Sequence, residues 1–357
     1  MKPVLKTPQP SRHPQPMVKA CRLAHLIFER PDLELAERFL TDFGLVTALK
    51  TGDTLYMRGT GPVPYCYRVH RGSEPRFVGF GLCVPDRADV INISNLPGAA
   101  SPAISQHPGG GLYTCVTDPC GFLNEVVHGQ SEVPVLPHRA ALTLNDGEPK
   151  RINATQRPPA SPPEVMKLGH IVLEVAEYQK TSQWYTRTYG FIPSDVQILP
   201  DGSPLVTFMR LDLGDRPADH HTLAIAQGIT PAYSHSAYEL VDADAVGMGQ
   251  RVLREHRWKH AWGIGRHILG SQIFDYWNDP WDDKHEHYCD GDVFTAEKEM
   301  GVVWASPAAL WQWGQPLPSS FTRPKLNFEN LSGLVRSLKR SPDLTLKKLI
   351  TMARLFS

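Results

Sequence analysis

The sequence has few cysteines, no long apolar run and no excess of charge of either sign. Its six cysteines are scattered through 357 residues; Cys115 and Cys120 lie five residues apart, the wrong spacing for a zinc knuckle, and no second pair accompanies them. No stretch approaches the ~20 apolar residues that cross a membrane. Lysine and arginine total 37 and the acids 37, so no net charge attracts nucleic acid or acidic lipid. We therefore expect no nucleic-acid or membrane partner and, with no signal peptide evident, a cytoplasmic protein with reduced thiols.

Proline and charge divide the chain. The first residues are rich in proline, lysine and glutamine, which is typical of disorder, and residues 157–163 concentrate prolines as an extended linker does. Residues 344–350 have helical periodicity, and we expect this helix to dock on its own protein or on a second copy rather than on a membrane. Five segments are predicted: a disordered tail (1–18), an N-terminal module (19–132), a proline-rich linker (133–164), a C-terminal module (165–317) and a basic extension with a helix (318–357).

One pattern occurs twice along the chain. Two strand-like runs carry a histidine each, His25 and His170, and each run leads through a helix-like stretch to an aromatic residue followed by glycine. Later, an Asp-Pro pair begins seven residues before Glu125 in the first copy and seven before Glu286 in the second. We therefore expect an α+β fold of two tandem modules, each of paired βαβββ units, with mixed, half-open eight-stranded β-barrels.

Three residues of the second copy are candidate metal ligands. Any one of the 15 histidines is more often structural, but His170, His235 and Glu286 each stand at a strand-like run. Two imidazoles and one carboxylate on one face of an ion form the facial triad of non-haem Fe(II) oxygenases. In the first copy Arg76 or Phe77 stands roughly where the second has His235, and neither can complete such a site. The first module is therefore expected to be metal-free.

Further motifs surround these candidates. The run His220-His221-Thr222-Leu223 lies one strand before His235, and Gly265-Arg266-His267 is followed by Tyr276 nine residues on and by Glu286 ten further. With these motifs, residues 165–317 resemble the two-domain type I extradiol ring-cleaving dioxygenases of the vicinal-oxygen-chelate superfamily, and residues 20–130 resemble them more faintly.

The resemblance implies a reaction and roles for residues. It implies cleavage of a catechol beside its two hydroxyls, with both atoms of O2 added, at Fe(II) held by His170, His235 and Glu286; Mn(II) suits the same ligands. His221 would be the acid/base, because an imidazole titrating near neutrality can take and return the substrate proton. Tyr276 would donate a hydrogen bond to a substrate oxygen, and His267 would orient the substrate or Tyr276. Core or structural roles remain alternatives for these two, and His220 is expected to face outward.

The substrate is less defined than the reaction. Four tryptophans suggest a roomy aromatic site, and hence a substituted or fused-ring catechol, although an oligomer interface accounts for them equally well; they are Trp277, Trp281, Trp304 and Trp311. A homo-oligomer is expected. Two alternatives stay open: a metal-dependent glyoxalase- or isomerase-type member of the superfamily, and a non-catalytic small-molecule binding protein on the same fold.

Overall fold

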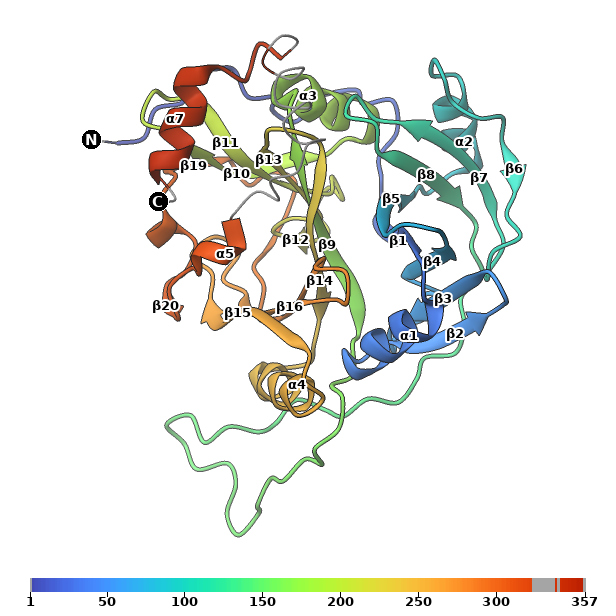
Figure 1. Ribbon diagram of the computed structural model, residues 1–357, viewed down its shortest axis with the longest axis vertical. Coiled ribbons are helices and arrows are strands. Elements are labelled where there is room, and N and C mark those ends of the chain that lie inside the picture. Colours follow the sequence, from blue (N-terminus) through green and yellow to red (C-terminus); the bar gives the residue numbers. More distant parts are fainter. Residues whose placement is uncertain (1, 323–337, 339–340, 356–357) are drawn as a thin grey trace.

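The computed structural model describes residues 2–322, 338 and 341–355 (Figure 1). The chain forms two modules side by side, the N-terminal one drawn in blue to teal and the C-terminal one in green to red. All six cysteines are free thiols. Within these described ranges no helix is long and apolar enough to cross a membrane.

The N-terminal module is one mixed sheet made from two βαβββ units. The first unit comprises β1 (Arg22–Arg30), α1 (Leu33–Asp42), β2 (Val46–Lys50), β3 (Thr54–Arg58) and β4 (Tyr67–Arg71). The second comprises β5 (Arg76–Cys83), α2 (Arg87–Ser94), β6 (Ala103–Ile104), β7 (Leu112–Thr117) and β8 (Leu123–His128). The strand order is β2-β3-β4-β1-β5-β8-β7-β6, so the units join where β1 pairs with β5, and the sheet has the expected eight strands.

The C-terminal module repeats this plan and extends it. Its first unit comprises β9 (Lys167–Val175), α3 (Tyr178–Tyr189), β10 (Ile192–Ile198), β11 (Pro204–Arg210), β12 (Ala218–Asp219) and β13 (Leu223–Gln227). Its second comprises β14 (Ala232–Glu239), α4 (Ala243–Glu255), β15 (Lys259–Arg266), β16 (Ile273–Asn278) and β17 (Lys284–Cys289). There follow β18 (Val293–Phe294), β19 (Gly301–Trp304), the 3-10 helix η1 (Pro307–Ala309), β20 (Trp313–Gly314), α5 (Ser319–Thr322) and α7 (Leu346–Leu355).

The predicted fold of paired βαβββ units is confirmed, with one difference in the second module. Its sheet has ten strands, in the order β19-β10-β11-β13-β9-β14-β17-β16-β15-β20, because β19 pairs with β10 at one edge and β20 with β15 at the other. These additions cover backbone groups that an eight-stranded sheet would leave unpaired at its edges.

The repeated aromatic-glycine pair ends a helix in each module. Gly190 caps α3 with φ of 73°, and Gly44, just past α1, has φ of 104°. Glycine adopts this left-handed conformation without the steric penalty of a Cβ, so the chain can turn from helix into the next strand.

The N-terminal segment, expected to be disordered, lies extended along the C-terminal module instead. The backbone N–H of Lys6 donates to Gly202 and that of Met17 to Arg187, and Arg12 pairs with the buried Asp212. Proline limits the backbone freedom of this segment, and the module supplies acceptors for its donors.

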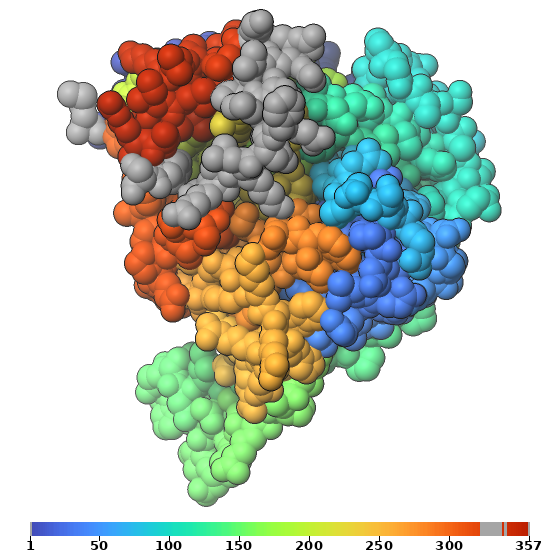
Figure 2. Space-filling view, viewed as in Figure 1, coloured from blue at the N-terminus to red at the C-terminus, as the bar shows by residue number. Residues whose placement is uncertain are grey.

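The linker and the extension differ in how closely they pack. Residues 129–166 form no helix or strand, and in Figure 2 most of this segment, in green, stands out from the body of the molecule. The helix expected near residues 344–350 is α7, which docks on its own chain: Met352 and Leu355 pack against Leu199 and Leu205. Residues 323–337, 339–340 and 356–357 of the extension lie outside the described part, and the boundaries of the five segments remain a prediction.

A buried ion pair joins the two modules. Arg30 at the end of β1 is 1% exposed, and its Nη2 lies 2.9 Å from Asp279 and 2.6 Å from Asp283 in the turn between β16 and β17. Burial favours the neutral form of Asp279 and raises its pKa, which Arg30 opposes. The two modules therefore meet at a buried ion pair, in which each charge compensates for the loss of water around the other.

We expect Arg30→Met to lower the free energy of unfolding by about 3–5 kcal/mol, because it leaves Asp279 buried without its cation. Arg76→Met is the matched control, since Arg76 pairs with Glu29 on the surface; it should change the value by less than about 0.5 kcal/mol. Urea unfolding of both variants measures the difference, and equal losses would contradict the role given to Arg30.

Candidate metal centre and active site

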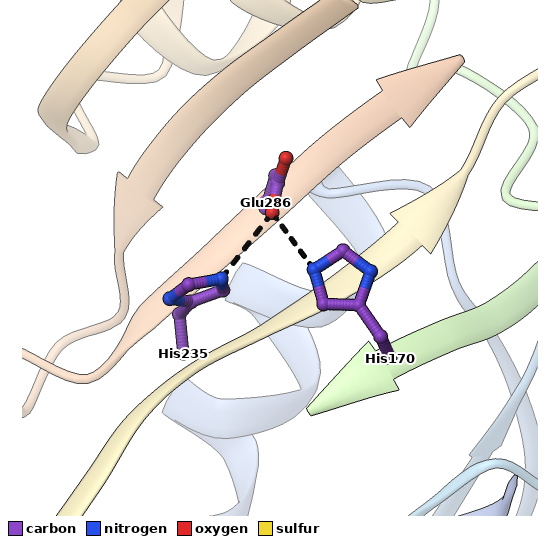
Figure 3. Close-up of side chains that lie close together, drawn as sticks. All are labelled: His170, His235 and Glu286. Carbon is purple, nitrogen blue, oxygen red and sulfur yellow. Dashed lines mark ion pairs between the residues drawn. The ribbon is translucent and has the colours of Figure 1, made fainter. Parts of the chain in front are cut away.

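The three candidate ligands lie on neighbouring strands and point to one place. His170 is on β9, His235 on β14 and Glu286 on β17, which are adjacent in the sheet. Ala237 pairs with His170 on one side and Glu286 on the other, and His235 lies two residues earlier on the same face of β14. One ligand atom from each residue lies within 4.8 Å of the others, with the carboxylate between the two rings (Figure 3).

Glu286 sets the electrostatics of this cluster. The side chain is 0% exposed, and neither carboxylate oxygen accepts a hydrogen bond of good geometry from the described residues. The Nε2 atoms of His170 and His235 lie 3.3 and 3.5 Å from its Oε2. Burial alone would raise the pKa of Glu286, but the neighbouring His170 holds it below its ordinary value. A buried carboxylate that stays ionised calls for a cation beside it.

The donor set fits a divalent transition metal. Burial lowers the pKa of His235 to about 3, so its imidazole is neutral at physiological pH and ready to coordinate. Packing orients the rings: His170 lies 5.6 Å from the ring of Tyr288, and His235 5.2 Å from that of Tyr276. Two imidazole nitrogens and one carboxylate leave open positions for other ligands, as Fe(II) and Mn(II) oxygenase sites require and closed structural zinc sites do not.

The N-terminal module has a histidine and a glutamate at the equivalent positions but not the middle ligand. Gly81 of β5 pairs with both His25 and Glu125, as Ala237 does with His170 and Glu286. The expectation that Arg76 or Phe77 occupies the place of His235 is wrong. By register that place belongs to Gly79, which pairs with Ile27 as His235 pairs with Val172. The pairing of β5 with β1 sets this register, and the sequence does not reveal it.

A fixed cation occupies this part of the N-terminal module. The guanidinium of Arg68 lies 3.2 Å from Glu125, whose other close partner is Nε2 of His25 at 2.5 Å. Burial lowers the pKa of His25, so Arg68 is the cation that neutralises Glu125. Arg68 pairs with Ile27 as Ala224 of the C-terminal module pairs with Val172. No other group of three suitable ligands occurs among the residues the structure describes.

The two adjacent histidines of the second motif both face inward. His221 lies with its ring centroid 3.9 Å from that of His170, and burial lowers the pKa of His221 well below its ordinary value. It is therefore a neutral base at pH 7 rather than a group titrating near neutrality. The expectation that His220 faces outward is wrong: it is buried, and its Nδ1 lies 2.9 Å from Nδ1 of His221. Both precede β13 in a loop, where strand alternation does not apply.

His267 and Tyr276 form a hydrogen-bonded pair beside the carboxylate. Nδ1 of His267 lies 2.7 Å from the carbonyl oxygen of Leu310, which can only accept, so Nδ1 carries the proton. Nε2 of His267 then accepts from the Tyr276 hydroxyl at 3.0 Å. Of the two roles predicted for His267, this contact supports the orientation of Tyr276.

These groups surround a cavity of about 170 Å³ with mostly apolar walls. Of the two readings of the four tryptophans, a place in the site is not found, because none of them lines the cavity. Trp277 is buried in the core, Trp281 packs against Arg30, Trp304 lies on β19 and Trp311 packs against Trp262. The aromatic walls are Phe208, Trp262 and Phe321, none of which sequence reasoning identified. Trp262 pairs with Tyr276 across β15 and β16, and Phe321 comes from α5 in the C-terminal extension.

Comparison with known proteins places the chain among similar folds. It is 28% identical over 306 residues to Metapyrocatechase 2 of Cupriavidus necator, a match covering 84% of this chain and 90% of the relative. No family model matches the chain.

Among solved structures, an extradiol ring-cleaving dioxygenase from B. fuscum matches with a TM-score of 0.73 and 17% identity, covering 90% of this chain and 87% of that one. Homoprotocatechuate 2,3-dioxygenase from Arthrobacter globiformis gives 0.71 and 18%, with coverages of 91% and 98%. A Mn(II)-bound glyoxalase from Novosphingobium aromaticivorans gives 0.71 and 22%, with coverages of 87% and 97%. The chain shares the fold of these enzymes, and the resemblance drawn from its sequence is confirmed.

Matched substitutions in the two modules test where the metal binds. We expect His170→Ala to abolish bound iron, because it removes one of three ligands, and His25→Ala to leave the iron content unchanged and alter stability modestly. The measurement is iron per chain after reconstitution with Fe(II) and removal of excess. Equal iron loss in the two variants would mean that both modules contribute to one site.

Proposed function

We propose that this protein is an extradiol catechol dioxygenase. It opens an aromatic ring beside two adjacent hydroxyls and adds both atoms of O2, at a non-haem Fe(II) held by His170, His235 and Glu286. The observation that supports this most is the convergence of these three residues at a cavity that two of them, His170 and His235, line together with His221 and Tyr276. The named relative and the dioxygenases of similar fold support the same reaction.

The metal and the protein divide the chemistry. A bound Fe(II) supplies a Lewis acid on which a diol and O2 can be held together, and Mn(II) is the other ion that this donor set suits. His221, neutral and facing the cavity, takes the proton from a substrate hydroxyl and returns it later in the reaction. Tyr276 stays protonated because burial raises its pKa, so its hydroxyl, held by His267 before a substrate binds, can turn its one proton to a substrate oxygen.

The cavity favours a neutral, substituted or fused-ring catechol. Phe208, Trp262 and Phe321 offer ring faces for stacking or edge contacts. No lysine or arginine is among the described residues that line the cavity, so no fixed cation awaits an anionic substituent. Besides the histidines and Tyr276, the polar lining residues are Gln197, Ser234 and Gln272, and each can contact an uncharged polar group.

We also propose where the enzyme acts and what it binds. Its binding partner is the small aromatic diol substrate, and the enzyme is a cytoplasmic homo-oligomer. The free state of all six cysteines agrees with a reducing compartment.

A metal-dependent glyoxalase or isomerase is the alternative, because the Mn(II)-bound glyoxalase has a similar fold. Such sites usually take four ligands from paired modules. The pairing of Arg68 with Glu125 argues against a ligand from the N-terminal module. A non-catalytic binding protein would leave His221, His267 and Tyr276 without a function.

The reaction is tested by adding a panel of catechols to the iron-loaded protein. We expect substrate-dependent O2 uptake and yellow ring-cleavage products, with larger neutral catechols favoured over catechol itself. A protein that binds zinc or nickel stoichiometrically and takes up no O2 with any catechol would support the glyoxalase-type alternative.

The acid/base role of His221 gives a separate test. We expect His221→Ala to keep its iron and its affinity for the catechol but to lose kcat by roughly 10²–10⁴, the usual share of a general acid/base. His256→Ala is the control, because His256 is half exposed and pairs with Asp42 outside the cavity. Unchanged kcat in His221→Ala would assign proton transfer to another group.

A further inference from the structure

A chain of three hydrogen-bonded side chains leads from β10, the strand next to one edge of the sheet, to the candidate base. Oδ2 of Asp195 on β10 lies 2.7 Å from Nε2 of His220. Nδ1 of His220 lies 2.9 Å from Nδ1 of His221, whose ring faces His170. Asp195 and His220 do not line the cavity, so neither contacts the substrate.

The chain fixes which nitrogen of His221 carries the proton. The Asp195 carboxylate can only accept, so Nε2 of a neutral His220 is the donor and its Nδ1 is left as an acceptor. Nδ1 of His221 must then donate to it, which leaves Nε2 of His221 with a free lone pair. That is the tautomer in which His221 can take a proton.

The surrounding structure leaves the middle ring little freedom. The backbone N–H of His220 donates to the carbonyl of Asp292, and its ring lies 5.6 Å from that of Phe208 and 5.5 Å from that of Phe294. A Cβ on Gly270 would stand 3.1 Å from Nδ1 of His220, and one on Gly301 would stand 1.9 Å from Oδ1 of Asp195. The absence of a side chain at both glycines therefore leaves room for the hydrogen-bonded Asp195 and His220.

We propose that Asp195 and His220 are positioning residues that hold His221 in the orientation and tautomer of a general base. The proposal rests on the proposed function, since it concerns the base of that reaction. In many enzymes a carboxylate orients a catalytic histidine by accepting a hydrogen bond from its second ring nitrogen. Here the imidazole of His220 lies between the carboxylate and the catalytic histidine.

Removing the carboxylate tests the proposal. Asp195→Leu keeps the branched shape and the number of non-hydrogen atoms of the side chain but offers no acceptor, so His220 and His221 can adopt the other tautomers. We expect kcat for the best catechol of the panel to fall on the order of 10–100-fold, with KM within about threefold and iron content unchanged. Asp195→Asn keeps an oxygen that can accept from His220 and should recover part of the loss. Gly301→Ala, which displaces the carboxylate without changing its chemistry, should lower kcat in the same direction.

Asp212→Leu is the matched control, because Asp212 is also buried and charge-paired in this module but lies outside the cavity. It should lower the unfolding temperature and leave kcat unchanged. If Asp195→Leu behaves as the control does, the chain is structural and the proposal is wrong. A wild-type protein that cleaves no catechol would instead refute the proposed function, which the first measurement of the series reveals.

Discussion

The burial of the Glu286 carboxylate is the constraint on which this site depends. An ionised carboxylate withdrawn from water is destabilising unless a cation or strong donors replace its hydration. Around Glu286 the sheet places the neutral imidazoles of His235 and His221, the Tyr276 hydroxyl and a largely apolar cavity, and the described lining of that cavity includes no lysine or arginine. The negative charge of Glu286 is therefore available to a bound metal ion, and the neighbouring side chains can contact a substrate.

The two modules meet the same constraint in different ways. Both bury a glutamate opposite a histidine at equivalent points of the sheet, but Arg68 neutralises Glu125 from within the chain. At the corresponding position Ala224 leaves room, and His235 replaces Gly79. Two differences between the equivalent sheets thus distinguish a charge pair complete within the chain from a site that needs a bound ion. The ion pair of Arg30 with Asp279 connects the two modules.

The sequence predicted what depends on local pattern. The repeated histidine strands, the terminal glutamates and the spacing from His267 to Tyr276 indicated the modules and the cluster, because strand period and motif spacing are local properties. Strand pairing was less accessible: only the pairing of β1 with β5 shows that Gly79 occupies the place of His235, and only the pairing of β15 with β16 places Trp262 beside Tyr276. Asp195 escaped notice because its partner His220 lies in a loop, where no periodicity states which way a side chain points.

The position of Phe321 bears on how the centre is made. Phe321 packs 5.0 Å from Tyr276 and 5.3 Å from Trp262, yet it follows every candidate ligand in the sequence. During synthesis the strands that carry His170, His235 and Glu286 leave the ribosome before this wall of the cavity does. This wall of the cavity is therefore made last, and it comes from outside the repeated units that carry the ligands.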